Sequence, residues 1–160
     1  MIDRRNVLKG LAAATVAKLV APHAEASTMS EDGLVSVASK YSVKETLDRL
    51  EAELKAKSIT VFARIDHAAG AAAVAMPLRP TEVLIFGNPK AGTPLMQSKQ
   101  TIGIDLPLKV LAWQDAEGKV WLTYNDPRWL AQRHRLGPET DASVNAMATL
   151  LANLARAAAG

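Results

Sequence analysis

Segments with the period of a β-strand alternate along this sequence with segments that have the period of an α-helix. Residues 59–67 carry apolar side chains at every second position, and residues 82–86 contain the continuous apolar run Val-Leu-Ile-Phe after Glu82, typical of an interior strand covered on both faces. Residues 42–57 instead repeat apolar side chains every three to four positions, after a capping box of Ser42 and Glu45. These periods predict helices packed on a sheet.

The same patterns predict five strands and four helices. The strands are expected at residues 33–40, 59–67, 82–86, 108–115 and 119–125. The helices are expected at residues 42–57, 93–104, 126–133 and 144–158. The second helix is expected to begin with Thr93 as N-cap and Pro94 as its first residue, whereas residues 68–81 are alanine-rich and are broken by Pro77 and Pro80. In the second strand, Ile59, Val61, Ala63 and Ile65 are expected to face the core, and Arg64 to face outward.

Length and composition fit one globular domain of the α+β class. The chain has 160 residues, enough to bury roughly two thirds of its unfolded surface in a single core. It contains no cysteine, which excludes disulfides, cysteine-bound zinc and thiol catalysis. No apolar run approaches the ~20 residues of a membrane-spanning helix. Because no ligand spacing of a metal site is found, neither a metal nor another cofactor is predicted.

The first 26 residues resemble a bacterial export signal of the twin-arginine type. Arg4 and Arg5 precede a modest apolar stretch at residues 10–21, and residues 24–26 have the small-x-small pattern that a signal peptidase accepts. The alternative is a basic N-terminal helix of a cytosolic protein. The resemblance predicts cleavage after Ala26, a periplasmic product and no stable membrane anchor after cleavage.

Cleavage would leave a single domain, residues 27–160, with almost balanced charge. The whole chain has a formal net charge of +3, and the first 26 residues hold four basic and two acidic residues, so the remaining net charge is +1. A near-neutral domain with interspersed charges lacks the basic surface that binds nucleic acid or an anionic membrane. Nucleic acid is therefore not predicted as a partner.

The segment after residues 82–86 has the outline of a phosphate-binding loop. A phosphate loop needs Lys and then Ser or Thr after its second glycine, but here Thr93 and Pro94 follow Gly92, which excludes nucleotide hydrolysis. A weaker hypothesis remains, in which Lys90, Thr93 and the N–H groups of the helix start bind a small anion or carboxylate. The alternative is helix capping alone.

Polar residues on two later strands are further candidates for a site. Lys109 shares its strand parity with Trp113 and Asp115, so it either lines a pocket or extends toward the edge of the sheet. Tyr124 and Asn125 lie at a strand end, beside an aspartate that is most simply a helix N-cap. Of these residues, Lys109 is the leading single candidate.

Histidine offers less support for acid–base chemistry. His67 has Asp66 beside it, but adjacent residues of a strand point to opposite faces. His134 lies between Arg133 and Arg135, which disfavours a metal cation next to it. No Gly-x-Ser-x-Gly elbow is present to hold a serine nucleophile.

An ordered set of motifs resembles the bacterial family called domain of unknown function 302. The motifs are Phe86-Gly87-Asn88-Pro89, Gly92-Thr93-Pro94-Leu95-Met96, Leu106-Pro107-Leu108-Lys109-Val110-Leu111 with Trp113 and Asp115, Tyr124-Asn125-Asp126-Pro127, and Arg133-His134. The resemblance covers about residues 33–155. It implies a β-α-β(4)-α fold, an antiparallel sheet with helices on one side, and a homodimer. It implies no activity, because none is established for the family.

Three functions fit these observations. The first is an exported, cofactor-free homodimer that binds a small ligand or a protein partner at one face of the domain, with Asn88, Thr93, Lys109, Tyr124 and Asn125 as its residues. The second is a hydrolase or isomerase with a pocket around Lys109, Asp115 and His134. The third is a structural or assembly role, which predicts an exposed apolar patch on the isolated protomer.

Overall fold

A computed structural model of the chain, which describes residues 28–29 and 31–160, contains one antiparallel sheet. Its strands are β1 (Thr28–Met29), β2 (Leu34–Ser39), β3 (Thr60–Asp66), β4 (Thr81–Gly87), β5 (Leu108–Gln114) and β6 (Val120–Asn125). They lie in the order β1-β2-β6-β5-β4-β3, and every neighbouring pair is antiparallel. The predicted signal peptide, with Arg4 and Arg5, lies outside the described residues.

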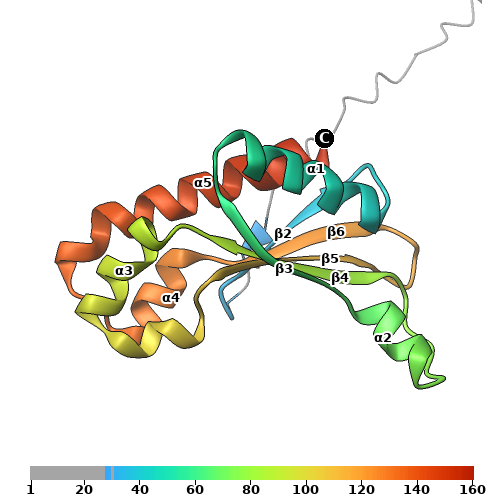
Figure 1. Cartoon of the computed structure of the whole chain (residues 1–160), viewed down its shortest axis with the longest axis horizontal. Coiled ribbons are helices and arrows are strands. Elements are labelled where there is room, and N and C mark those ends of the chain that lie inside the picture. Colours follow the sequence, from blue (N-terminus) through green and yellow to red (C-terminus); the bar gives the residue numbers. More distant parts are fainter. Residues whose placement is uncertain (1–27, 30) are drawn as a thin grey trace, which may run out of the picture.

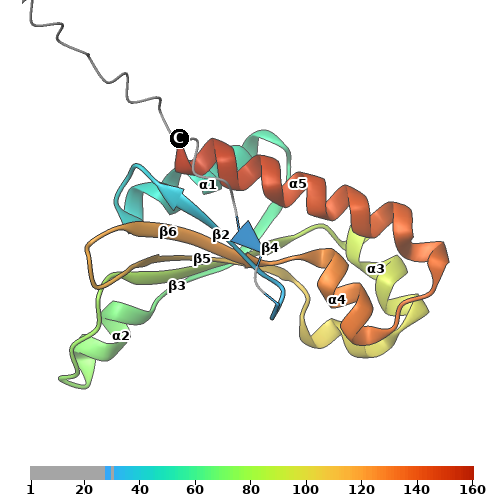
Figure 2. The same ribbon diagram turned by 180° about the vertical axis from the view of Figure 1, so that it is seen from behind.

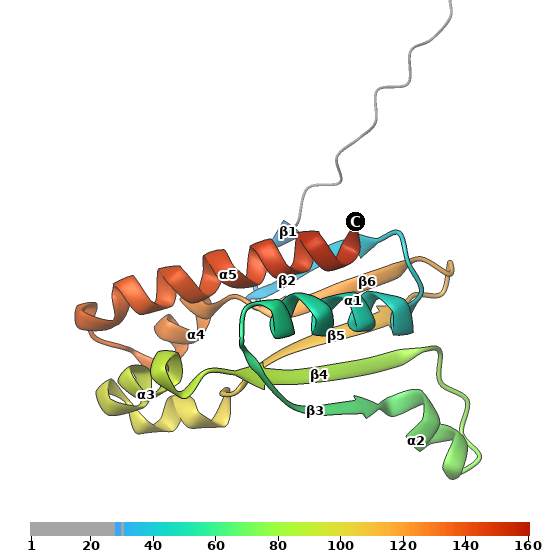
Figure 3. The ribbon, with the colours of Figure 1, turned by 45° about the horizontal axis from the view of Figure 1, so that its top comes forward.

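Two long helices cover one face of this sheet (Figure 1). They are α1 (Val43–Ala56) and α5 (Asp141–Ala159), which run side by side over the strands in Figure 3. The path β2-α1-β3-β4-β5-β6-α5 is the predicted β-α-β(4)-α arrangement, with its helices on one side of an antiparallel sheet. The predicted α+β class is therefore confirmed.

Shorter helices lie at the two ends of the sheet. Helix α2 (His67–Ala73) projects at one end, whereas α3 (Pro89–Ser98) and α4 (Pro127–His134) lie together at the other, as Figure 2 shows. Two 3-10 helices, η1 (Gln100–Ile104) and η2 (Pro138–Thr140), follow α3 and α4 along the chain. The end with α3 and α4 is the one that positions the candidate site.

The hydrophobic core lies between the sheet and the two long helices. Leu84 of β4 pairs with Val110 of β5, and both side chains are almost completely buried. They belong to one apolar cluster with Leu50 of α1 and Leu151 of α5. Burying large apolar side chains in this way is the main source of stability in a domain of this size.

The apolar run within residues 82–86, from Val83 to Phe86, is not covered on both faces, contrary to the sequence prediction. β4 is an interior strand between β3 and β5, but only Leu84 and Phe86 are buried, while Val83 and Ile85 are half-buried. The reason is that α1 and α5 cover one face only. The opposite face, called the open face below, carries Val83, Ile85, Leu111, Trp113 and Trp121.

β3 departs from its predicted alternation because of a bulge. Its pairing with β4 shifts between Val61 and Ala63, so the side chains after the bulge exchange faces. Ile65, predicted to face the core, is 43% exposed, and Arg64, predicted to face outward, lies against α1. As the outermost strand, β3 also has only one neighbour to cover it.

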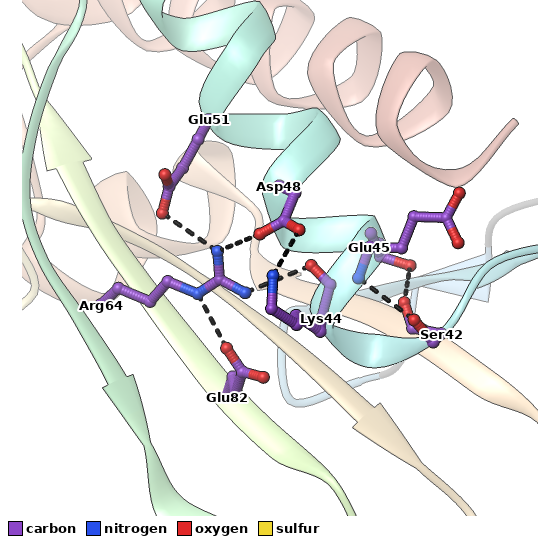
Figure 4. A network of polar contacts seen from close by, with 8 residues as sticks. Ser42, Lys44, Glu45, Asp48, Glu51, Arg64 and Glu82 are labelled. Carbon is purple, nitrogen blue, oxygen red and sulfur yellow. Dashed lines mark hydrogen bonds and ion pairs between the residues drawn. The ribbon is translucent and has the colours of Figure 1, made fainter.

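Arg64 joins β3 to β4 and α1 (Figure 4). Its Nε donates to Glu82 at 2.8 Å, and its Nη1 donates to Asp48 at 2.6 Å and to Glu51 at 3.3 Å. Burial works against the charge of Arg64, but these carboxylates raise the pKa of the guanidinium above its usual value. Hydrogen bonds from Lys44 and then Arg64 hold the pKa of Asp48 below its usual value. The network fixes α1 over the edge of the sheet.

Helix α2 is absent from the sequence prediction. It occupies part of the alanine-rich segment 68–81, and its N-cap is Asp66, whose Oδ1 accepts a hydrogen bond from the N–H of Ala69 at 2.8 Å. Pro77 and Pro80 come after its end, so they do not interrupt it. None of the residues of α2 is buried.

Helix α3 starts earlier than predicted. Its N-cap is Asn88, whose Oδ1 accepts from the N–H of Lys90 at 2.9 Å, and its first residue is Pro89 rather than Pro94. Pro94 therefore lies inside the helix, where its ring removes one backbone hydrogen bond. The predicted single helix over 93–104 is instead the end of α3 followed by η1.

Candidate ligand-binding pocket

A cavity of about 550 Å³ opens between the end of β4, the start of β5, α3 and α5. Its walls include Phe86 from β4, Leu108 from β5, Met96 from α3, and Met147 and Leu150 from α5. Pockets that hold small molecules in proteins typically measure roughly 300–1,000 Å³ and are mainly apolar. The size and the lining of this cavity both fit that description.

Two glycines help to leave this space open. A Cβ atom at Gly87 would lie 3.5 Å from the side chains of Phe62 and Pro107, and one at Gly92 would lie 3.6 Å from Leu106. These are ordinary contact distances, so alanine would fit at either position. A larger side chain at Gly92, which lines the cavity, would instead take up its volume.

Three polar side chains line the cavity, namely Lys57, Asn88 and Thr93. All three residues are exposed, so they border the cavity on its solvent side. The sequence predicts Asn88 and Thr93 as site residues, and the fold brings them to the same pocket. It does not predict Lys57, which follows the last residue of α1.

The N–H groups at the start of α3 are already used by its cap. Pro89 has no N–H, and the N–H of Lys90 donates to the side chain of Asn88. The N–H groups of Ala91 and Gly92 both donate to the carbonyl oxygen of Asn88, at 2.9 and 3.1 Å. An anion at this helix start would have to displace these bonds, so the side chains around the cavity are better placed to bind a ligand.

Lys109 reaches toward the loop that forms one wall of the cavity. Its Nζ donates to the carbonyl oxygens of Asp105 at 2.9 Å and of Pro107 at 3.1 Å. Leu106 and Pro107 line the cavity, although Lys109 does not. Lys109 therefore positions the wall, and its own ammonium lies outside the pocket lining.

Asp115 lies at the opposite end of β5 from Lys109, roughly 20 Å away along the strand at ~3.4 Å per residue. Its Oδ2 accepts from Nε1 of Trp121 at 2.7 Å, and its Oδ1 accepts from the N–H groups of Glu117 and Lys119. The hydrogen bond from Trp121 is the main reason that the pKa of Asp115 lies below its usual value. Asp115 thus closes the β5–β6 hairpin, and no shared pocket with Lys109 is formed.

His134 has a carboxylate partner that is distant in the sequence. Its Nε2 lies 2.5 Å from Oδ2 of Asp105, and its Nδ1 lies 3.3 Å from the hydroxyl of Thr101. Arg133 also contacts the Asp105 carboxylate, at 3.2 Å. This cluster ties the end of α4 to the loop after η1, and none of its members lines the 550 Å³ cavity.

Tyr124 and Asn125 lie away from the main cavity. Tyr124 is buried and borders a smaller cavity of about 210 Å³, together with Asp126 and Arg128. Burial, followed by the charge of Asp126, raises the pKa of the Tyr124 hydroxyl. Asn125 pairs with β2 at the end of β6. The predicted single face of site residues is therefore divided between separate places.

The region that the sequence motifs mark is also the region that a known family shares. A family model described as "Domain of unknown function DUF302" matches residues 35–154. The chain belongs to the DUF302 family. This confirms the family part of the sequence resemblance, and the matched range contains all the residues named above as candidates.

A solved structure agrees with the DUF302 fold. The crystal structure of an uncharacterized conserved DUF302 protein from Bacillus stearothermophilus has a TM-score of 0.70 to this chain, and the match covers 79% of this chain and 98% of that chain. The two sequences are 19% identical. The likeness therefore concerns the fold.

Curated relatives of this DUF302 chain carry the name of a membrane channel. "Fluoride-specific ion channel FluC 1" of Brucella suis, the protein of the same name in Brucella abortus, and FluC 2 of Brucella melitensis are each 52% identical over 134 residues, or 84% of this chain. The match spans only 53% of the first relative and 50% of the other two. The chain thus spans about half the length of these relatives.

Within residues 28–29 and 31–160, no helix has the length and hydropathy needed to cross a bilayer. In the same residues, no group of three or more His, Cys, Asp or Glu side chains is arranged to hold a metal ion.

Proposed function

We propose that this DUF302 domain binds a small, largely apolar molecule in the 550 Å³ cavity. The observation that carries the proposal is the cavity itself, which is walled by apolar side chains of β4, β5, α3 and α5. Moving apolar surface out of water contributes roughly 25 cal/mol per Å². A ligand that covers these walls would therefore gain most of its affinity from its apolar body.

The proposal is tested with the neutral fluorescent probe N-phenyl-1-naphthylamine. Saturable fluorescence enhancement is expected with the wild-type chain and with Gly92→Ala, because a Cβ at Gly92 makes only an ordinary contact with Leu106. Gly92→Phe is expected to abolish the enhancement by filling the cavity. Leu150→Trp provides a second blocking variant from α5, should Gly92→Phe unfold.

A matched control comes from Gly70 in α2, where an added Cβ meets no atom within 4 Å. Gly70→Phe adds the same ring far from the cavity and is expected to bind the probe like wild type. Undiminished probe binding by folded Gly92→Phe and Leu150→Trp would overturn the proposal, as would the absence of any saturable binding to wild type.

A second candidate function is a role alongside a fluoride-specific ion channel. It is supported by the Brucella relatives with that name, which match this chain over about half of their length. Deleting the gene for this chain is then expected to increase the sensitivity of growth to sodium fluoride. Equal growth of the deletion strain and its parent across a fluoride series would contradict this role.

We also infer that the chain is exported and that it pairs with a second copy of itself. Export is supported by Arg4 and Arg5 before the apolar stretch at residues 10–21. Changing both arginines to lysine is expected to leave an unprocessed chain in the cytoplasm, and normal processing of that variant would contradict export by the twin-arginine route. Pairing is supported by the exposed apolar side chains of Val74, Met76 and Leu78, which follow α2.

A further inference from the structure

We infer that the ligand of the cavity is an amphiphile with one carboxylate, whose apolar chain fills the cavity and whose carboxylate is bound by Lys57. This inference rests on the proposed function and names its ligand class. Lys57 is the one charged residue among the described residues that line the cavity. An otherwise apolar pocket with a single cation at its border fits a ligand with a single negative charge.

Lys57 is available for such a contact. It is the C-cap of α1, and its backbone N–H donates to carbonyl oxygens of the last turn. Its ammonium group has no ion pair or hydrogen bond with any other described residue, and the residue is exposed. By contrast, Arg64 and Lys109 have their donors engaged by protein oxygens.

Two neutral donors, from Asn88 and Thr93, also line the cavity. The Oδ1 atom of Asn88 accepts from Lys90, which leaves its NH₂ group without a partner among the described residues. The hydroxyl of Thr93 likewise has no partner in this part of the chain. A carboxylate oxygen can accept a hydrogen bond from each of these groups, so the proposal assigns the carboxylate to Lys57, with Asn88 and Thr93 as further donors of the same cavity lining.

The apolar part of the ligand sets a second expectation. Each CH₂ group that enters the cavity contributes about fourfold in affinity, until the cavity is filled. The affinity should therefore rise from octanoate to decanoate to dodecanoate, until the chain is long enough to fill the cavity. A free carboxylate without a chain, such as acetate, is expected not to compete.

The experiment measures displacement of N-phenyl-1-naphthylamine by sodium decanoate and by decan-1-ol, which share their chain and differ in charge. With the wild-type chain, decanoate is expected to compete more strongly than decanol at low salt. Lys57→Gln should lower the affinity for decanoate about two- to fivefold, the range expected for an exposed ion pair, and leave the affinity for decanol unchanged. Lys57→Arg should restore the preference, and 0.5 M NaCl should reduce it.

Lys55→Gln is the matched control. The substitution removes the same charge from an exposed residue in the last turn of α1, but Lys55 does not line the cavity. Decanoate and decanol should therefore displace the probe from this variant as they do from wild type. Equal effects of Lys57→Gln and Lys55→Gln, or equal competition by decanoate and decanol in wild type, would overturn the inference while leaving apolar binding intact. Failure of the probe itself to bind would overturn both proposals.

Discussion

Arg64 contacts three carboxylates while only 23% of its side chain is exposed. Arg64→Ala would leave Glu82, whose side chain is 13% exposed, without its cation. It would also release α1 from the edge of the sheet. We expect the free energy of unfolding to fall by about 1–3 kcal/mol, as measured by urea denaturation.

Lys44 supplies the control for this variant. It pairs with Asp48 in the same network, but 75% of its side chain is exposed. Exposed pairs contribute about 0–1 kcal/mol, so Lys44→Ala should change stability much less than Arg64→Ala. Equal losses of stability in the two variants would mean that the partly buried contacts of Arg64 contribute no more than the exposed pair of Lys44.

Asp48 is expected to make the domain less stable in acid. Hydrogen bonds from Lys44 and Arg64 lower its pKa, so the folded chain holds its carboxylate ionised at a lower pH than the unfolded chain does. The stabilisation is complete above the unfolded pKa of about 4 and is lost as the pH falls through the lower folded pKa. Urea titrations between about pH 5 and pH 2 should therefore show a steeper loss for wild type than for Asp48→Asn. Parallel curves would assign the acid sensitivity to other groups.

At the scale of whole elements, the turn that leads into β2 depends on Gly33. This residue has a φ of 81°, and a Cβ atom there would overlap the side chain of Trp129 in α4. Gly33→Ala should therefore lower the free energy of unfolding by about 1–3 kcal/mol or more, and thermal denaturation would measure this loss. Gly92→Ala in α3, which has no such overlap, should instead stabilise by up to about 1 kcal/mol. A neutral Gly33→Ala would contradict this account.

The start of a helix could be predicted where the sequence offers only one capping residue for it. Ser42 caps α1 and Asp126 caps α4, as expected, and each side chain accepts from the backbone of its first turn. Before α3 the sequence contains two cap-and-proline pairs, Asn88-Pro89 and Thr93-Pro94. Local rules favour neither pair, and the structure uses the first. Their places in sequence motifs at element ends predict Asn88 and Thr93 as site candidates, but not the cavity that they share.

Contacts between residues that are far apart in the sequence could not be predicted from local sequence patterns. The bulge in β3 turns Arg64 toward α1, and no local signal in residues 59–67 indicates that bulge. Asp105 meets His134 across 29 positions because η1 and α4 lie together at one end of the sheet. Lys57 is the last residue of the predicted helix 42–57 and carries no local signal of a binding site, whereas the fold makes it part of a cavity lining that also includes residues of α3 and α5.

At the scale of the molecule, one segment buries almost nothing in the single chain. Residues 67–78, here called the arm, contain α2 and no Asp, Glu, Lys or Arg. Their apolar side chains Val74, Met76 and Leu78 are 67%, 64% and 51% exposed. The arm connects the edge strand β3 to its neighbour β4, whose open face carries Val83 and Ile85 (Figures 1 and 2). A second copy offers the same uncharged arm and the same open face with its apolar side chains, so we propose that each arm covers the open face of the other chain.

The predicted dimer is tested by placing a charge on the arm. Met76→Asp should convert a wild-type dimer into a monomer, as measured by size-exclusion chromatography with light scattering. Ala52→Asp adds the same charge at an exposed position of α1 and should leave the dimer intact. A monomeric wild-type chain, or a dimeric Met76→Asp variant, would contradict pairing through the arm.

The pairing of β2 with β6 also sets an order of events during synthesis. Leu34 pairs with Asn125 and Ser39 with Val120. β2 therefore cannot form this pairing until β6, which the ribosome synthesises much later, is available. Meanwhile β4, β5 and β6 meet as successive antiparallel neighbours. Contacts that are close along the chain form faster than distant ones. We therefore expect the N-terminal strand to join the sheet last, after most of the chain has left the ribosome.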